Sequence, residues 1–336
     1  MSPTLAVLVF FLYWPALKTI TYSTRLARRS APRTAPRCVS NFTELIGPSR
    51  GWLVIVFVVV MVVAIVAGRT LALRSEGWAE VLRPWMSTIS VGSGLVALAF
   101  LFTEDYRKVY VVTMIISGGI VVLGLIAALG IAFIAYQPVR GASVYRTLLV
   151  WPYAISPPIA GLIFFVMFDA NTGIIDHLTS GLFGWDLPDY RSSGWLAQVV
   201  VILASIWKTL GYNLLFYIAG LQTIPMDQIE AAMIDGAGSW NRFRHIVIPA
   251  LSPVTFFLVV TNLTYAFFET YGTIDYLTKG GPAGDTSVSM YEIIRVFSTE
   301  GDLGRGAAQS MLLFAGVVAL TMWQFQTTGK KVHYGS

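Results

Sequence analysis

Charge is scarce in this sequence of 336 residues, since 12% of the residues are charged and 55% are hydrophobic. An ordinary soluble domain carries about 25% charged residues, so these charges are too few to cover a globule in water. Cysteine and histidine are also rare. The single cysteine, Cys38, excludes an intrachain disulfide and a CxxC pair, and the three histidines form no HExxH pair. We therefore expect no metal site.

Catalytic and nucleic-acid motifs are absent as well. The sequence has no GxxxxGK[ST] phosphate loop and no GxSxG elbow. Its net charge of +5 is not arranged as a basic stripe with interleaved aromatic residues, which excludes a nucleic-acid partner. We expect a chain that is not an enzyme and binds no cofactor itself, which leaves a transporter subunit, a channel or, less favoured, a membrane-embedded transferase.

Long apolar runs are the main feature that the sequence does contain. Each is near or above the ~20 residues that cross a bilayer and is apolar on all sides, so a soluble helical core is excluded. None alternates with period two, which excludes a β-barrel. The sequence predicts an all-α, polytopic transmembrane helical bundle with candidate spans at residues 4–22, 51–72, 84–102, 109–136, 147–168, 195–222, 246–271 and 305–326. The fifth span is broken by Pro152, Pro157 and Pro158, which predicts a kink.

Arginine and lysine in short connections predict the orientation of these helices, because such residues concentrate on the cytoplasmic side. The connections predicted to be cytoplasmic contain Arg140 and Arg146, Arg242 and Arg244, and Lys330 and Lys331. The connections 169–194 and 272–304 between them are mainly acidic and are expected to face outward.

The first connection contradicts this scheme. Its only acidic residue is Glu44, against Lys18, Arg25, Arg28, Arg29, Arg33, Arg37 and Arg50. Its charge therefore predicts the cytoplasmic side, whereas eight alternating spans place it outside. Either the first segment does not cross, or one of the next two apolar stretches is re-entrant, or orienting charges and the true start lie upstream of Met1.

The cytoplasmic connection 224–249 reads IPMDQIEAAMIDGAGSWNRFRHIVIP. Asp227 and Glu230 have the spacing of a capping box, Gly236 to Gly238 can end that helix, and Ser239 can cap a second one. The small side chains of Ala231, Ala232 and Ala237 leave a low surface against which another protein could pack. The simpler alternative is that Glu230 only caps its own helix.

The pattern E-A-A-x-x-D-G-A, followed by Phe243, Ile246 and Pro249, resembles the EAA loop of binding-protein-dependent ABC import permeases. In that family the loop forms a coupling helix that docks on a cytoplasmic ATPase subunit. The resemblance implies this role for Glu230, Ala231, Ala232, Asp235, Gly236 and Ala237. It also implies the type I, MetI-like permease fold, with six core helices and here about two extra ones in an N-terminal insertion.

The resemblance extends from about Tyr106 to the C-terminus. Within the family, the segments YRTLLVWPYAISPPIAG, WKTLGYNLLFYIAGLQTIP, NLTYAFFETYGTID, KGGP and GRGAAQS are most similar to permeases of glycerol-3-phosphate importers. This implies that the substrate is sn-glycerol-3-phosphate or a glycerophosphodiester. A sugar or polyol importer is the runner-up, and a passive channel is the alternative from another class.

The resemblance also implies an organisation and a set of partners. Residues 1–47 are expected to form a first span and a basic loop, residues 48–104 a hydrophobic insertion of about two helices, and residues 105–336 the core permease domain. The implied partners are a second homologous permease, an extracytoplasmic binding protein, and two cytoplasmic ATPase subunits that hold ATP and Mg. The chain is expected to be a multi-pass protein of the bacterial cytoplasmic membrane.

Two polar stripes inside the spans predict a substrate pathway, because ionisable residues deep in a bilayer are costly. Lys208 lies ~20 Å into its span at 1.5 Å per residue. The stripes consist of Ser205, Lys208, Tyr212 and Asn213 on one helix and Asn262, Tyr265 and Glu269 on the next. A mid-membrane lysine suits a phosphate-bearing substrate. Two alternatives stay open, namely that Lys208 and Glu269 pair with each other, or that the tyrosines and asparagines only hold helices together.

The segment Lys279 to Pro282 is a turn by composition. The resemblance implies that Gly280, Gly281 and Pro282 contact the binding protein.

Overall fold

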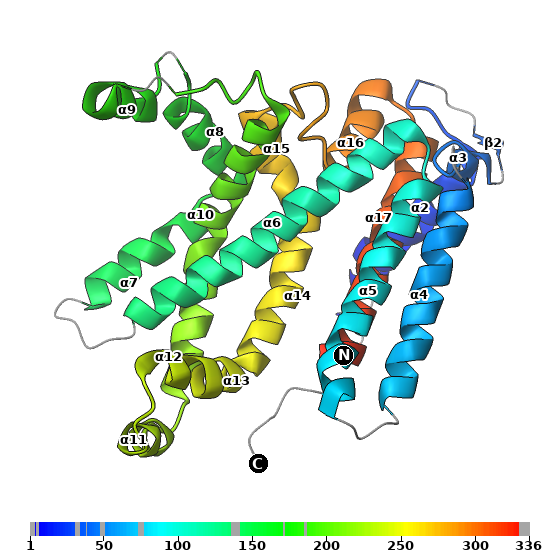
Figure 1. Cartoon of the computed structure of the whole chain (residues 1–336). Helices are drawn as coiled ribbons and strands as arrows, with labels where there is room; N and C mark the ends of the chain where they lie inside the picture. Colours follow the sequence, from blue (N-terminus) through cyan, green and yellow to red (C-terminus); the bar gives the residue numbers. More distant parts are fainter. Residues whose placement is uncertain are drawn as a thin grey trace. The chain divides into compact units, whose positions relative to one another are not determined.

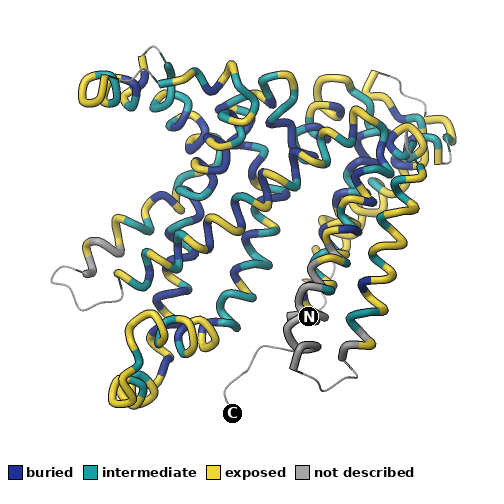
Figure 2. The backbone as a smooth tube through the Cα atoms, viewed as in Figure 1, coloured by how far each residue is buried: buried dark blue, intermediate teal, exposed yellow. Residues whose placement is uncertain are grey.

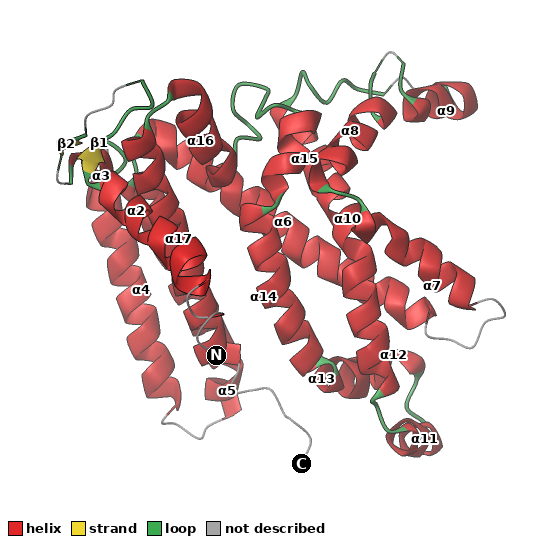
Figure 3. Cartoon of the chain, turned by 180° about the vertical axis from the view of Figure 1, so that it is seen from behind, coloured by secondary structure: helices red, strands yellow, loops and turns green. Residues whose placement is uncertain are grey.

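In the computed structural model, the described residues fold mainly into helices (Figures 1 and 3). The structure describes residues 4, 7–30, 34–37, 39–47, 51–72, 77–135, 142–170, 172–184 and 187–328. Several residues used in the sequence argument lie outside these ranges, namely Arg33, Cys38, Arg50, Arg140, Lys330, Lys331 and His333. The chain divides into two compact units, Met1–Val111 with Ile293–Met311 and Val112–Glu292 with Leu312–Ser336.

The first unit contains the N-terminal helices and a small two-stranded sheet. Its elements are η1 (Val9–Tyr13), α2 (Trp14–Ser23), β1 (Arg25–Leu26), β2 (Ala35–Pro36), α3 (Ser40–Thr43), α4 (Gly51–Ala72), α5 (Gly77–Leu101), the start of α6 (Glu104–Ala135), η4 (Val296–Glu300) and the start of α17 (Leu303–Thr328). Strands β1 and β2 are antiparallel, with Arg25 opposite Pro36. Helices α4 and α5 lie side by side as a hairpin (Figure 1).

Helix α4 is the most apolar helix of this unit. Its window Gly51–Gly68 has a mean hydropathy of 2.9, yet 6% of that window is buried inside the structure (Figure 2). Trp52, Ile55 and Val63 are each at least 60% exposed. Apolar side chains that are exposed on all sides of a helix of this length fit a hydrocarbon environment.

The residues just before α4 and just after α5 are paired with each other. Ile46 and Phe102 pair as an isolated β-bridge. The backbone N–H of Gly47 donates to the Leu101 carbonyl at 3.2 Å, and that of Thr103 donates to the Leu45 carbonyl at 3.0 Å. The roughly fifty apolar residues that the sequence sets apart therefore begin and end at adjacent points.

The second unit holds most of the remaining helices. They are the rest of α6, α7 (Ala142–Val150), η2 (Trp151–Ala154), α8 (Pro157–Met167), α9 (Ile174–Phe183), α10 (Gly194–Gln222), α11 (Met226–Ile234), α12 (Ser239–Arg242), η3 (Phe243–Val247), α13 (Ile248–Ala250), α14 (Ser252–Phe268), α15 (Thr270–Leu277) and the first turn of α16 (Ser289–Arg295). The core of this unit lies along α6 and α10, where four large side chains are fully buried, namely Ile116, Ile120, Val201 and Leu214.

The helices of the structure agree with most of the predicted spans. Four described helices are long and apolar enough to cross a membrane, or six if each bent pair counts as one span. The predicted kink is confirmed, because residues 147–154 and 157–167 meet at 108°. A second bend of 65° at Leu251 was not predicted. The remaining predicted spans, 4–22 and 84–102, correspond to η1 with α2 and to the apolar end of α5, Gly92–Leu101, and are not among these six.

Candidate coupling, pathway and docking sites

The segment with the EAA pattern forms a short exposed helix, α11, in which no residue is buried. The residue that precedes it is Pro225, whose φ of −61° is already close to the helical value, and no side chain caps the helix. The predicted capping box is therefore wrong, because Asp227 lies inside the first turn. Glu230 and Ala231 are exposed, which leaves them available to a partner.

The far end of α11 is closed by a Schellman motif. The backbone N–H of Gly236 donates to the Met233 carbonyl at 3.1 Å, and that of Ala237 donates to the Ala232 carbonyl at 2.9 Å. Gly236 has a φ of +77°, the left-handed conformation that glycine adopts without steric cost. The predicted helix end at Gly236 is confirmed.

Arg242 fastens the segment that follows, a contact that the sequence did not reveal. Its Nη1 donates to the carbonyl of Ala237 at 2.6 Å, and its Nη2 donates to Oγ of Ser239 at 3.3 Å. Helix α12 begins after Gly238 without a side-chain cap, so the predicted capping role of Ser239 is wrong. A charged donor strengthens such a bond, and this one ties the end of α11 to the helix that leads into α14.

Large apolar residues on and beside α11 are exposed, and Figure 2 shows most of this part of the backbone in the colour of exposed residues. Met226 and Met233 are each 55% exposed, Ile234 is 87% exposed, and Trp240 is 68% exposed. An amphipathic helix of this kind can lay its apolar residues into a groove of another protein.

Lys208 is the central residue of the 29-residue helix α10 and is 7% exposed. Its Nζ lies 5.2 Å from the ring centroid of Tyr153 and 5.2 Å from that of Tyr265. Tyr212 stacks on Tyr153 with 5.2 Å between ring centroids. We call Lys208 and these three tyrosines the lysine cage. Sequence reasoning missed Tyr153, which lies on another helix.

The bend between α7 and α8 brings Tyr153 to Lys208. Pro152 and Pro157 lack the backbone N–H that a continuous helix needs, so the chain turns at η2. Gly211, on α10, lets the last residues of α7, which lead directly into η2, approach closely. A Cβ at Gly211 would lie 2.6 Å from the Cα of Val150, which is too close for any side chain.

The two predicted asparagines hold helices together. Asn213 and Asn262 exchange side-chain hydrogen bonds of 3.0 and 2.6 Å, and the Asn262 amide also donates to the Leu258 carbonyl at 2.8 Å. Both residues are buried. They join α10 to α14, as polar residues commonly do in membrane bundles, and this favours the structural interpretation for these two positions.

The remaining polar groups of the two stripes are the hydroxyls of Ser205 and Tyr265 and the carboxylate of Glu269. In the described part of the chain, the buried hydroxyls of Ser205 and Tyr265 have no hydrogen-bond partner. Glu269 is exposed at the end of α14. Among the described residues no carboxylate lies within ion-pair distance of Lys208, so the predicted alternative of a direct Lys208–Glu269 pair is absent.

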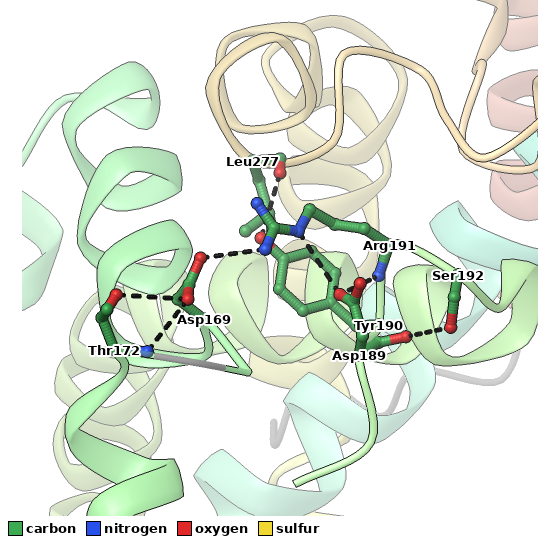
Figure 4. A network of polar contacts seen from close by, with 7 residues as sticks. All are labelled: Asp169, Thr172, Asp189, Tyr190, Arg191, Ser192 and Leu277. Carbon is green, nitrogen blue, oxygen red and sulfur yellow. Dashed lines mark hydrogen bonds and ion pairs between the residues drawn. The ribbon is translucent and has the colours of Figure 1, made fainter.

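The connection between α9 and α10 carries a network of polar contacts around Arg191 (Figure 4). Its Nη2 pairs with Oδ2 of Asp169 at 2.9 Å, and its Nε pairs with Oδ1 of Asp189 at 3.3 Å. The neighbouring Tyr190 is buried, and its hydroxyl donates to the carbonyl of Leu277 at 3.3 Å. Burial raises the pKa of Tyr190 to about 12, an effect that the charge of Arg191 partly opposes. Our prediction from the sequence assigned these charges only an orienting role.

The turn Lys279 to Pro282, which is predicted to contact the binding protein, lies beside this network. A cavity of about 260 Å³ is lined by Phe165, Arg191, Tyr276, Leu277, Thr278, Lys279, Gly281 and Pro282. The turn is fixed by Thr286, whose Oγ1 donates to the Gly281 carbonyl at 2.7 Å. Gly280 is buried, and a Cβ there would lie 2.6 Å from the Tyr291 ring. Gly281 and Pro282 therefore present a surface, whereas Gly280 shapes the turn.

Comparison with known proteins gives one family. The profile of the family described as binding-protein-dependent transport system inner membrane component matches residues 64–323. The sn-glycerol-3-phosphate transport system permease protein UgpA of Yersinia pestis is 41% identical over 242 residues, which cover 72% of this chain and 81% of that protein. UgpA of Rhizobium meliloti (strain 1021) is 43% identical over 238 residues, which cover 70% and 80%.

The fold also has solved counterparts. A bacterial alginate ABC transporter, in complex with an alginate pentasaccharide-bound periplasmic protein, has a chain that superposes with a TM-score of 0.62 at 19% identity, over 70% of this chain and 82% of that chain. A second structure of a bacterial ABC transporter involved in alginate import gives a TM-score of 0.61 at 18% identity, over 68% and 80%. At 18–19% sequence identity, this structural similarity supports the fold alone, which is that of an ABC importer permease.

Proposed function

The chain belongs to the family of binding-protein-dependent transport system inner membrane components, and from this premise we propose that it carries sn-glycerol-3-phosphate, or a related glycerophosphodiester, across the bacterial cytoplasmic membrane. It forms the pathway together with a second, homologous permease. A binding protein delivers the substrate from outside, and two ATPase subunits, which hold ATP and Mg, drive the transport.

The observation that carries the substrate assignment is the lysine cage. A buried ammonium without a carboxylate partner is costly, and an anionic ligand removes that cost by supplying the missing charge. A phosphate also offers acceptor oxygens to the nearby Ser205 and Tyr265 hydroxyls. Lys208 therefore acts as a point charge for the phosphate, while the tyrosine rings hold its ammonium by cation–π attraction.

The coupling to ATP is mechanical in this proposal, because no nucleotide motif occurs in the sequence. The exposed apolar residues of α11 dock in a groove of the ATPase subunit. Movement of that subunit then reaches α14 through α12 and η3, since Arg242 ties the end of α11 to this segment. Alternating access follows from the closing and opening of the ATPase pair.

A sugar or polyol importer is the second candidate. Tyrosine rings beside a polar group can also stack against sugar rings. Here Tyr153 and Tyr265 flank Lys208, and Tyr212 stacks on Tyr153. The two candidates differ in what they need from Lys208, because only a phosphate requires its charge.

The test is uptake of labelled glycerol-3-phosphate by the assembled importer with Lys208→Gln. We expect the KM to rise at least tenfold while the complex assembles normally. Lys18→Gln is the matched control, since Lys18 also makes a cation–π contact, 5.5 Å from the Trp14 ring, but is exposed on α2. Unchanged glycerol-3-phosphate uptake by an assembled Lys208→Gln complex would remove Lys208 from the pathway.

A further inference from the structure

The arginine-rich segment, which we define as the described residues of 24–37, is joined to the start of α17. The backbone N–H of Arg29 donates to the Gly301 carbonyl at 2.7 Å, and that of Gly304 donates to the Ala27 carbonyl at 3.1 Å. Arg28 and Asp302 form an isolated antiparallel bridge. A Cβ at Gly304 would lie 2.3 Å from the Arg25 carbonyl oxygen, so glycine is required for this approach.

A second set of contacts joins the segment to α3 and to Glu44, the residue after it. The buried side-chain amide of Asn41 donates to the carbonyls of Ser23 and Arg25, each at 2.9 Å. The Arg37 guanidinium pairs with Glu44 at 3.0 Å and donates to Asn41 at 3.2 Å. Within the first unit, these contacts hold the arginine-rich segment between α3 and the start of α17.

This position decides between the two orientations that the sequence left open. Helix α17 has 26 residues, about 39 Å at 1.5 Å per residue, which is enough to cross the ~30 Å hydrocarbon core once. Lys330 and Lys331, which follow it, are predicted to be cytoplasmic. The opposite end of α17, and with it the arginine-rich segment, then faces outward, against the charge rule.

Three arginines of this segment are exposed and unneutralised. Arg28 and Arg29 have neither an ion pair nor a side-chain hydrogen bond to any residue that the structure describes, and Arg25 only donates to the Thr34 hydroxyl at 3.4 Å. Outward arginines without carboxylate partners can bind the anionic groups of a partner or of a lipid.

Apolar surface continues directly from these arginines. Helix α2 ends at Ser23, two residues before Arg25, and exposes Trp14 by 54%, Leu17 by 58% and Ile20 by 47%. A surface that changes from exposed apolar side chains to exposed arginines within two helical turns has the profile of a membrane interface, where the apolar part contacts acyl chains and the guanidinium groups reach the phosphates.

We propose that Arg25, Arg28 and Arg29 form an extracytoplasmic binding surface for the phosphate groups of anionic lipids in the outer leaflet of the membrane. The lipid phosphates supply the charge that the protein lacks here and fix the start of α17 and the ends of the α4–α5 hairpin at the level of the headgroups. This role is independent of the transported substrate.

The first part of the test is the side of the membrane. In a Cys38→Ser background without other cysteines, Thr34→Cys places a thiol at an exposed position of the segment. We expect a membrane-impermeant maleimide to label it in intact cells, as it labels the outer control Thr299→Cys, whereas Gln228→Cys on α11 is labelled only after permeabilisation. Labelling of Thr34→Cys only after permeabilisation would overturn the proposal.

The second part is the lipid. The whole importer is placed in nanodiscs of phosphatidylglycerol or phosphatidylcholine, and the difference between the two thermal unfolding midpoints is measured. We expect the triple variant Arg25→Gln/Arg28→Gln/Arg29→Gln to lose at least half of this difference, and the matched Arg→Lys triple variant to keep it. An equal difference in all three proteins would overturn the proposal. So would an unchanged difference accompanied by weaker affinity for the binding protein, because the partner would then be that protein.

Discussion

Substitution of Gly236 tests how helix α11, which we propose couples transport to ATP hydrolysis, ends. Gly236 is left-handed, with a φ of +77°, and a Cβ built on it meets no atom within 4 Å. Any cost of a side chain therefore comes from the backbone conformation and not from a clash. The matched control is Gly238→Ser, since Gly238 also has open space around it but an ordinary φ of −64°.

The expected size of the effect follows from this conformation. A left-handed residue other than glycine costs roughly 1–2 kcal/mol, and Asn and Asp tolerate the conformation better than other residues. At about 1.4 kcal/mol per tenfold change, the ratio of closed to frayed helix ends falls about 5- to 30-fold in Gly236→Val. This ratio should fall least in Gly236→Asn, and its value in Gly236→Asp should lie between those of Gly236→Asn and Gly236→Val.

Two measurements read out this series. Hydrogen exchange at the Ala237 amide, which donates to Ala232, should accelerate in the order Asn, Asp, Val. The number of ATP molecules hydrolysed for each substrate imported should rise in the same order, because a frayed helix transmits the ATPase movement poorly. If Gly236→Val exchanged and coupled like Gly238→Ser, the reasoning about this helix end would be refuted.

Three further predictions concern other contacts. Arg242→Gln removes a charged hydrogen bond worth roughly 1.5–3 kcal/mol and should raise the number of ATP molecules hydrolysed per substrate imported; an unchanged ratio would show that this bond is not part of the coupling. Asn213→Leu should lower the free energy of unfolding of the complex by about 1–2 kcal/mol, which is measured as a lower thermal unfolding midpoint. The double variant Asn213→Leu/Asn262→Leu should recover part of this loss, whereas additive losses would argue against the pair. The raised pKa of Tyr190 favours its protonated form in the folded state, so its stabilisation is complete below pH 10 and is lost as the pH rises to about 12, by about 1.4 kcal/mol per pH unit. Chemical unfolding of Tyr190→Phe should lack this slope, and an identical slope in the variant would mean that another group titrates.

The long helices were predictable because composition alone defines them. The predicted span 51–72 coincides with α4, and 195–222 begins within one residue of α10, since apolar runs of this length have few other stable states in a membrane. The kink at Pro152 and Pro157 was predictable for the same local reason. The short helices α9, α15 and α16 were not, because they depend on packing against distant segments.

The sites divide in the same way. The spacing of Lys208 and Tyr265 on their helices predicted two facing stripes, but Tyr153 comes from a helix whose approach depends on Gly211, which is a tertiary effect. Helix ends were the least predictable, because Pro225 and Gly238 start helices in which side-chain caps were expected. The placement of the arginine-rich segment needed the backbone pairing with residues 301–304, which no periodicity reveals.

The central claim, that this chain is the permease of an ATP-driven glycerol-3-phosphate importer, is tested most directly in proteoliposomes. The chain is reconstituted with a second permease, the ATPase and a loaded binding protein, and uptake of labelled glycerol-3-phosphate is measured against a disaccharide. The account predicts uptake that requires ATP and the binding protein and that prefers glycerol-3-phosphate. Uptake without ATP would indicate a channel, and ATP-driven uptake of the disaccharide alone would contradict the assigned substrate.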